Sequence, residues 1–143
     1  MIKERYCSRK VAKLLKEKGF NEDCYTYYDD IDDSINRFDK GYHFNNTSYP
    51  WGVPSDINKA KKYLVAPTQS MVMDWLREVH KLHIEFVLNQ DVENEESVIE
   101  NYYHFNVSRL DRFVNEGGDC EFYNSYEEAC EAAIKYCLEN LIN

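Results

Sequence analysis

The sequence lacks a long apolar run and a targeting segment. No stretch approaches the roughly 20 apolar residues of a membrane-spanning helix. The charged start Met1–Arg5 has no apolar run behind it, so no signal peptide is expected. We therefore expect a cytoplasmic protein without a membrane partner.

Disulfide and cofactor motifs are also missing. The 5 cysteines include no CxxC pair, and Cys130 and Cys137 would lie about 10 Å apart along a helix, beyond disulfide reach. Gly117-Gly118 lacks the spacing of a phosphate-binding loop. The aspartates at 29–33 lack the glycine and glutamate of a calcium-binding EF-hand loop. We expect buried, reduced thiols, no metal and no cofactor.

Positive charge is scarce outside the N-terminal segment. The net charge is −9, but residues 1–18 carry seven Lys/Arg against two Glu, a net +5, so the remainder carries −14. Residues 91–100 hold five acids and no base. Such a body disfavours nonspecific nucleic-acid binding, in which basic side chains neutralise phosphates. Only the N-terminal helix could take part.

Aromatic residues are abundant, with 12 Tyr, 7 Phe and 2 Trp making 15% of the chain. Tyrosine and tryptophan combine a large apolar area with one polar tip. They suit a half-buried sheet, and they suit a contact surface equally well.

Hydrophobic periodicity and capping residues predict three helices. Helices are expected over 8–18, with Ser8 as N-cap and Gly19 as terminator, over 67–81, and over 125–141, where Ser125 and Glu128 form a capping box. The expected strands are 24–28, 62–66, 83–89, 102–107 and 120–123, with a loop at 91–100 and a turn at 116–119.

This element order predicts an α+β fold in one domain spanning 1–143. About three helices would pack largely on one face of a small, mainly antiparallel sheet of three to five strands. Residues 29–60 combine turn-forming residues with aromatics, which predicts a long ordered loop excursion with a short hairpin near Gly41–Phe44.

Two blocks of the sequence carry a family resemblance. Leu64–Thr68 followed by Trp75–His80, and the block Tyr126–Leu141, are similar to small uncharacterised proteins of gut anaerobic bacteria, their phages and other mobile elements. The resemblance implies a bacterial or phage cytoplasmic setting and an accessory role. It implies no catalytic residues.

The leading hypothesis is a noncatalytic protein-interaction module, because no catalytic motif is complete. The aromatics of the long loop are the expected contact surface, since aromatics dominate interface hot spots. These residues are Tyr42, Phe44, Tyr49 and Trp51. Exposed aromatics are also compatible with a homodimer.

Two alternatives stay open. The first is a small-molecule or enzymatic site between the 29–60 loop and the sheet, built from His83, Glu85, His104 and Cys120. The second is an acidic DNA-mimic inhibitor, which the negative body favours and the basic N-terminal segment opposes. The HxxH pair His80 and His83 provides too few ligands for zinc by itself.

Overall fold

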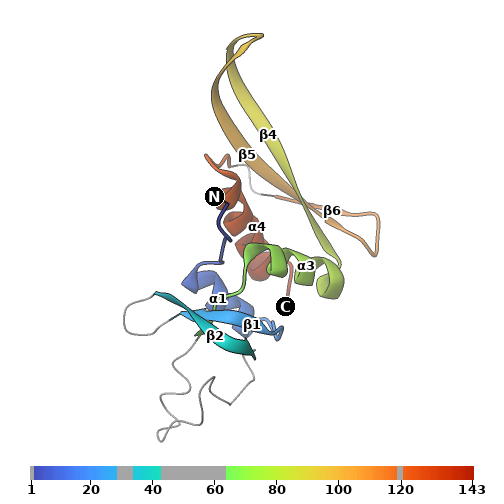
Figure 1. Cartoon of the computed structure of the whole chain (residues 1–143). Coiled ribbons are helices and arrows are strands. Elements are labelled where there is room, and N and C mark those ends of the chain that lie inside the picture. Colours follow the sequence, from blue (N-terminus) through green and yellow to red (C-terminus); the bar gives the residue numbers. More distant parts are fainter. Residues whose placement is uncertain (1, 29–33, 43–63, 119–120) are drawn as a thin grey trace, which may run out of the picture. The chain divides into compact units, whose positions relative to one another are not determined.

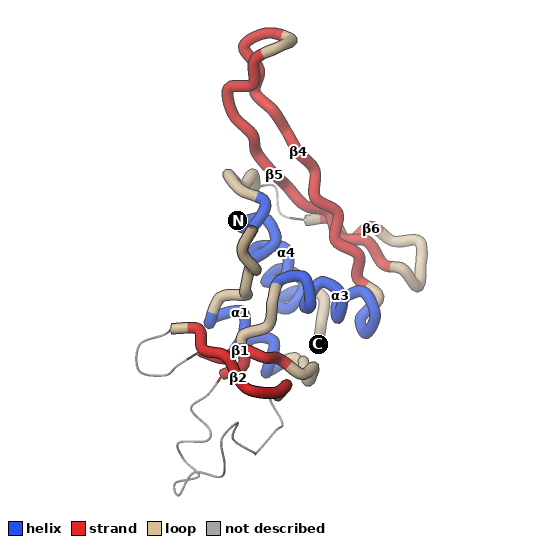
Figure 2. The backbone as a smooth tube through the Cα atoms, in the orientation of Figure 1, coloured by secondary structure: helices blue, strands red, loops and turns tan. Residues whose placement is uncertain are grey.

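The computed structural model describes residues 2–28, 34–42, 64–118 and 121–143, with the backbone alone for 38–42. These residues contain three helices and six strands, and the strands form two antiparallel three-stranded sheets (Figures 1 and 2). The α+β class is therefore confirmed, although the strands are divided between two sheets where one was expected.

The chain divides into two compact units, Met1–Thr68 and Gln69–Asn143. Each has its own helical and strand elements, so each is described by itself. The expectation of one domain over the whole chain stays a prediction.

The first unit packs one helix on a sheet of order β2-β1-β3. Its elements are α1 (Arg9–Glu17), β1 (Cys24–Tyr28), β2 (Ile35–Tyr42) and β3 (Leu64–Val65). Ser8 caps α1 by accepting a hydrogen bond from the Val11 amide at 3.2 Å, as expected. Gly19 adopts a left-handed φ of +88°, which lets the chain leave the helix.

The interior of the first unit joins α1 to β1 and β3. Ala12, Tyr28, Leu64 and Ala66 are buried together, with Tyr6 against them. The Tyr28 hydroxyl donates a hydrogen bond to the Cys7 carbonyl, so this buried tyrosine has a partner for its polar tip.

β2 was not foreseen as a strand. Residues Ile35–Tyr42 pair antiparallel with β1 inside the segment expected to be an irregular loop. Ile35, Asn36 and Arg37 lie opposite Tyr28, Tyr27 and Thr26. The free edge of the aromatic strand β1 thus imposes extended structure on a sequence of weak local preference. The hairpin expected near Gly41–Phe44 extends outside the described residues.

The second unit contains α3 (Gln69–His80), β4 (Leu82–Asn94), β5 (Ser97–Arg109), β6 (Asn115–Gly117) and α4 (Tyr126–Asn140). The sheet order is β4-β5-β6, with antiparallel pairing throughout. Ser125 caps α4 by accepting a hydrogen bond from the Glu128 amide at 3.1 Å. Trp75 is buried on α3, which confirms its expected place in the core.

The acidic stretch 91–100 is not the expected loop. β4 continues to Asn94 and β5 starts at Ser97, so the two strands form one long hairpin with a tight turn. Pairing continues through Asp91 opposite Glu100 and Val92 opposite Val98. Cross-strand pairing therefore outweighs the turn preference of the acidic residues. Only that preference is visible in the local sequence.

β6 also differs from the expectation. Asn115–Gly117 forms a short strand beside β5 where the predicted turn should begin. Of the strand expected at 120–123, Tyr123 forms a single bridge to Tyr103, and residues 119–120 lie outside the described part. A β-carbon on Gly118 would come 2.3 Å from the Phe105 carbonyl oxygen, so the chain approaches β5 more closely than a larger residue would allow.

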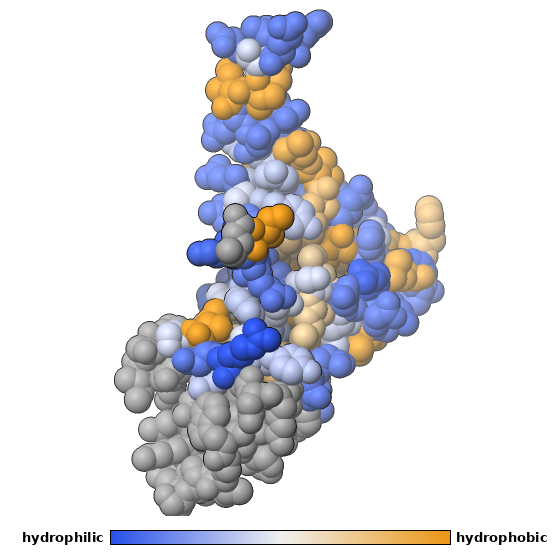
Figure 3. Space-filling view, viewed as in Figure 1, coloured by the Kyte–Doolittle hydropathy of each residue, from blue (hydrophilic) through white to orange (hydrophobic). Residues whose placement is uncertain are grey.

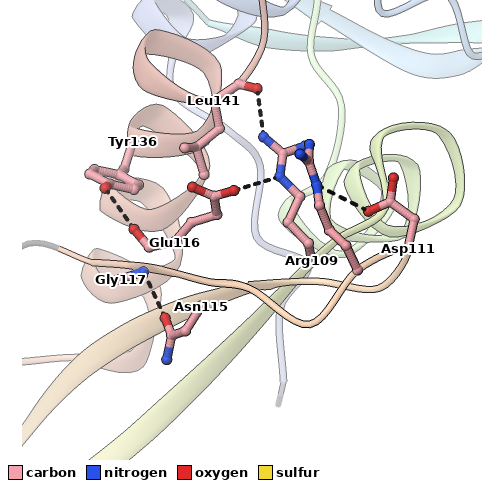
Figure 4. A network of polar contacts seen from close by, with 8 residues as sticks. Arg109, Asp111, Asn115, Glu116, Gly117, Tyr136 and Leu141 are labelled. Carbon is pink, nitrogen blue, oxygen red and sulfur yellow. Dashed lines mark hydrogen bonds and ion pairs between the residues drawn. The ribbon is translucent and has the colours of Figure 1, made fainter.

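A polar network secures β5 and β6 to the end of α4 (Figure 4). The Arg109 Nε atom lies 2.8 Å from Oε1 of Glu116, and its guanidinium also donates to the Leu141 carbonyl at 3.4 Å. The Tyr136 hydroxyl donates to the Glu116 carbonyl at 3.3 Å. A cation at a helix C-terminus is favourable because the last carbonyls lack helical partners.

Candidate interaction surface

The candidate site is the part of the β4–β5 hairpin that extends past α4 (Figures 1 and 2). Paired residues of an antiparallel ladder point to the same face of the sheet. Phe86, opposite Phe105, contacts the Tyr126 ring of α4, with ring centroids 4.9 Å apart. Phe105 contacts Tyr136 of the same helix at 5.7 Å. We call this side of the hairpin the helix-side face.

The helix-side face carries exposed apolar residues beyond the helix that covers it, interrupted by the polar pair Gln90 and Asn101. Near α4 its members Phe105 and Val107 are fully buried. Farther along, Leu88 is 49% exposed, and the cross-strand pair Val92 and Val98 is 57% and 50% exposed. Ile99, in the bulge beside Val98, is 67% exposed. Figure 3 shows hydrophobic bands on the hairpin between hydrophilic ones.

We call Leu88, Val92, Val98 and Ile99 the overhang. Scattered surface apolar residues are ordinary, but these four lie on two paired strands and on the same face as the buried Phe105 and Val107. A face of this kind is covered elsewhere in the same sheet by α4. The overhang therefore consists of residue types that are usually buried, yet its side chains are about half exposed or more.

The charge of the hairpin has one sign. From Leu82 to Ser108 there is no Lys or Arg, whereas six acids occur: Glu85, Asp91, Glu93, Glu95, Glu96 and Glu100. All six are exposed. The hairpin thus combines apolar rows with a uniformly negative surface, which repels acidic partners and attracts basic ones.

The opposite side of the hairpin, the outer face, carries a tyrosine between two carboxylates. The Tyr102 hydroxyl lies 2.8 Å from Oε2 of Glu100 and 3.0 Å from Oδ2 of Asp91. Glu100 and Asp91 are directly opposite across the strands, where like charges repel. The hydrogen bond to Glu100, and to a smaller extent that to Asp91, raises the pKa of Tyr102. The hydroxyl therefore keeps its proton and lies between the two carboxylates.

His104 belongs to the same outer face. Its Nδ1 atom lies 2.7 Å from the Asn89 side-chain amide, and its ring contacts Phe122 edge-on at 5.6 Å. Phe122 also contacts Tyr102, at 6.4 Å, and is itself 60% exposed.

The structure places three of the four residues suggested for an enzymatic pocket on one face of the hairpin, at successive positions along the strands. His83 lies opposite Ser108, Glu85 opposite Asn106, and His104 opposite Val87, which places all three on the outer face. His83 and Glu85 are exposed. Cys120 lies outside the described residues, so the complete group stays a prediction.

Of the suggested aromatic contact residues, Tyr42 alone lies within the described part of the chain. Tyr42 ends β2 and lies opposite Cys24, with only its backbone described. Phe44, Tyr49 and Trp51 lie outside the described residues. The overhang itself was missed, although the alternation of Phe86, Leu88 and Val92 continues past the point where the strand was expected to end.

Comparisons with models of protein families, with curated proteins and with solved structures found no match for this chain. None of the helices described here is long and apolar enough to cross a membrane. Across residues 2–28, 34–42, 64–118 and 121–143, no three His, Cys, Asp or Glu side chains are grouped so as to hold a metal ion.

Proposed function

We propose that this protein is a noncatalytic interaction module that binds a protein partner through the overhang of the β4–β5 hairpin. The observation that carries the proposal is the exposure of the paired residues Val92 and Val98 on a face that α4 covers closer to the core. Burial of exposed apolar area is the main driving force of protein association. A partner that covers the overhang would complete the cover that α4 begins.

The setting of this interaction is proposed from the sequence. The resemblance to small proteins of gut bacteria, phages and mobile elements supports an accessory role in the cytoplasm of a bacterial host. The aromatic segment containing Tyr42, Phe44, Tyr49 and Trp51 remains a proposed second contact region, because aromatic side chains dominate interface hot spots.

A photo-cross-linking experiment in the native host tests the proposal. A photoreactive amino acid is placed at Ile99 in the overhang, and in a matched variant at Asp74, an exposed position of α3. We expect one discrete cross-linked species from Ile99 and none from Asp74. Val92→Ser combined with Val98→Ser should remove it while the thermal midpoint stays within a few degrees. Equal cross-linking from both positions would refute the assignment.

The DNA-mimic alternative draws on the same six carboxylates of the hairpin. It predicts salt-sensitive binding to a basic nucleic-acid enzyme that disappears when Asp91, Glu93 and Glu95 become Asn or Gln. The apolar rows between the carboxylates favour the interaction module instead. Loss of the cross-link after charge neutralisation, with no effect of the Val92 and Val98 changes, would reverse this preference.

A further inference from the structure

β4 presents a long unpaired edge beside the overhang. In the order β4-β5-β6, the strand β5 is central, and β4 pairs with β5 alone among the residues that the structure describes. An unpaired edge exposes a row of backbone donors and acceptors that can template a further strand. Edges of this length are usually shortened, covered or interrupted by proline, and β4 contains no proline.

The hydrogen bonds of β5 identify which groups of β4 face that edge. Tyr103 exchanges both of its backbone bonds with Tyr123, at 2.8 and 2.7 Å, and the Arg109 amide bonds Val114 at 3.0 Å. These residues of β5 therefore bond away from β4. Their partners across the ladder, Leu88 and Leu82, must likewise direct N–H and C=O away from β5, toward the open edge.

The same alternation extends along the strand. The register is uninterrupted from Leu82 to Asp91, so Ile84, Phe86 and Gln90 also direct their backbone groups to the open edge. An incoming strand would therefore find a backbone donor and acceptor at every second residue from Ile84 to Gln90. That length is comparable with an ordinary strand.

The side chains beside the edge specify what such a strand would contain. On the helix-side face it would lie next to apolar residues that end at the polar Gln90: Ile84, Phe86 and Leu88. On the outer face it would lie next to two carboxylates, Glu85 and Asp91, with Val87 and Asn89 between them. Because successive residues of a strand point to opposite faces, apolar residues on the helix side would alternate with outer-side residues, and basic residues would be favoured where these meet Glu85 and Asp91. The absence of Lys and Arg from Leu82 to Ser108 leaves the carboxylates at this edge without a cationic neighbour on the hairpin itself.

We propose that β4 binds an extended partner segment of alternating apolar and basic residues, which adds to the sheet as a fourth strand. This inference rests on the proposed function and specifies the partner's chemistry and its binding mode. Backbone hydrogen bonds supply much of the affinity in strand addition, and the alternating side chains supply the specificity. A second copy of β4 is a poorer occupant, because it brings the same carboxylates and no basic residue.

Synthetic peptides test the binding mode directly on the full chain. The probe is a fluorescein-labelled peptide of about ten residues in which valine and lysine alternate. One control carries N-methyl groups on alternate backbone nitrogens, and another has all valines before all lysines. Fluorescence anisotropy measures binding. We expect the two controls to bind at least about tenfold more weakly than the probe.

Two protein variants test the same edge from the other side. Gln90→Pro removes an edge-facing N–H, and Gln90→Ala removes the same side chain while keeping that donor. Gln90→Pro should weaken binding of the alternating peptide about tenfold, and Gln90→Ala should leave it within about twofold. Circular dichroism checks that both variants fold. If Gln90→Pro is unfolded, the N-methylated peptide with the wild-type chain decides.

Three results would overturn the inference. Equal binding of the N-methylated and unmodified peptides would mean that charge alone attracts them. No binding of the alternating peptide would exclude strand addition by this chemistry. A wild-type dimer that Gln90→Pro converts to a monomer in light scattering would mean that a second copy fills the edge. A cross-link from Ile99 combined with any of these would preserve the interaction module and reject only the binding mode.

Discussion

The Tyr126 ring, at the first residue of α4, contacts the Phe86 ring at 4.9 Å and marks the boundary between two halves of the hairpin. On the core side of this contact, Phe105 and Val107 are fully buried. On the other side, Leu88 and Val92 are about half exposed. One face thus serves the fold at one end and, past the polar pair Gln90 and Asn101, presents exposed apolar residues to a partner at the other.

Truncation of a side chain on either side of this boundary should have different consequences. Phe105→Ala should lower the free energy of unfolding by about 3–5 kcal/mol, because it leaves a cavity beneath α4. Leu88→Ala should lower it by less than about 1 kcal/mol, because half of this side chain is already in water. Urea denaturation measures both. Similar losses would show that the overhang is part of the core.

Replacement of Arg109 should loosen the end of α4 from β5 and β6. Arg109→Met removes the ion pair to the half-buried Glu116 and the hydrogen bond to the Leu141 carbonyl. We expect a loss of about 1–3 kcal/mol in unfolding free energy.

Arg77→Met is the matched control, since the Arg77–Asp74 pair is solvent-exposed and should contribute no more than about 0.5 kcal/mol. If both variants unfold at the same urea concentration, the Arg109 network contributes nothing beyond a surface ion pair.

Acid should destabilise the second unit through His80. Burial, and to a smaller extent the charge of Arg109, lowers the pKa of His80 below its ordinary value of 6.5. The unfolded chain therefore binds this proton more readily than the folded one. The stability linked to His80 is fully present above pH 6.5 and is lost as pH falls through the lower pKa of the folded state.

His80→Gln should accordingly lose less stability than wild type between about pH 7.5 and pH 5.5 in urea titrations. A wild-type slope in the His80 variant would contradict this account.

The thiols should be inert in the folded protein. Burial raises the pKa of Cys24 and Cys137 to about 12 and that of Cys130 to about 11, and Cys7 is fully buried. Thiolate, the reactive form, is therefore scarce at neutral pH. Ellman's reagent should titrate these four only after denaturation, with Cys120 the sole candidate for reaction in the native state. Rapid native reaction of a Cys120→Ser variant, which keeps these four, would contradict this.

The helices could be predicted from the sequence because their signals are local. Ser8 and Ser125 accept the amide hydrogen bonds expected of N-caps, and Gly19 has the left-handed backbone that ends α1. Trp75 is buried as its helical spacing indicated. Each of these features depends on residues within one or two turns of one another.

The strands were harder because their signals are not local. The acidic residues 91–100 favour a loop when considered alone, and they become strand because each half pairs with the other. Likewise, β2 exists because β1 offers an edge. The exposure of the overhang depends on how far α4 covers the hairpin. No local sequence pattern contains that information.

The absence of lysine and arginine between Leu82 and Ser108 determines how contacts of the hairpin can be detected. Trypsin can cut after Lys81 and after Arg109 but nowhere between them, so this exposed arm would be released as one intact peptide. Amine-reactive cross-linkers and labels, which depend on lysine, would report the rest of the surface and miss this arm. Carbodiimide chemistry, which activates carboxylates, would map it instead.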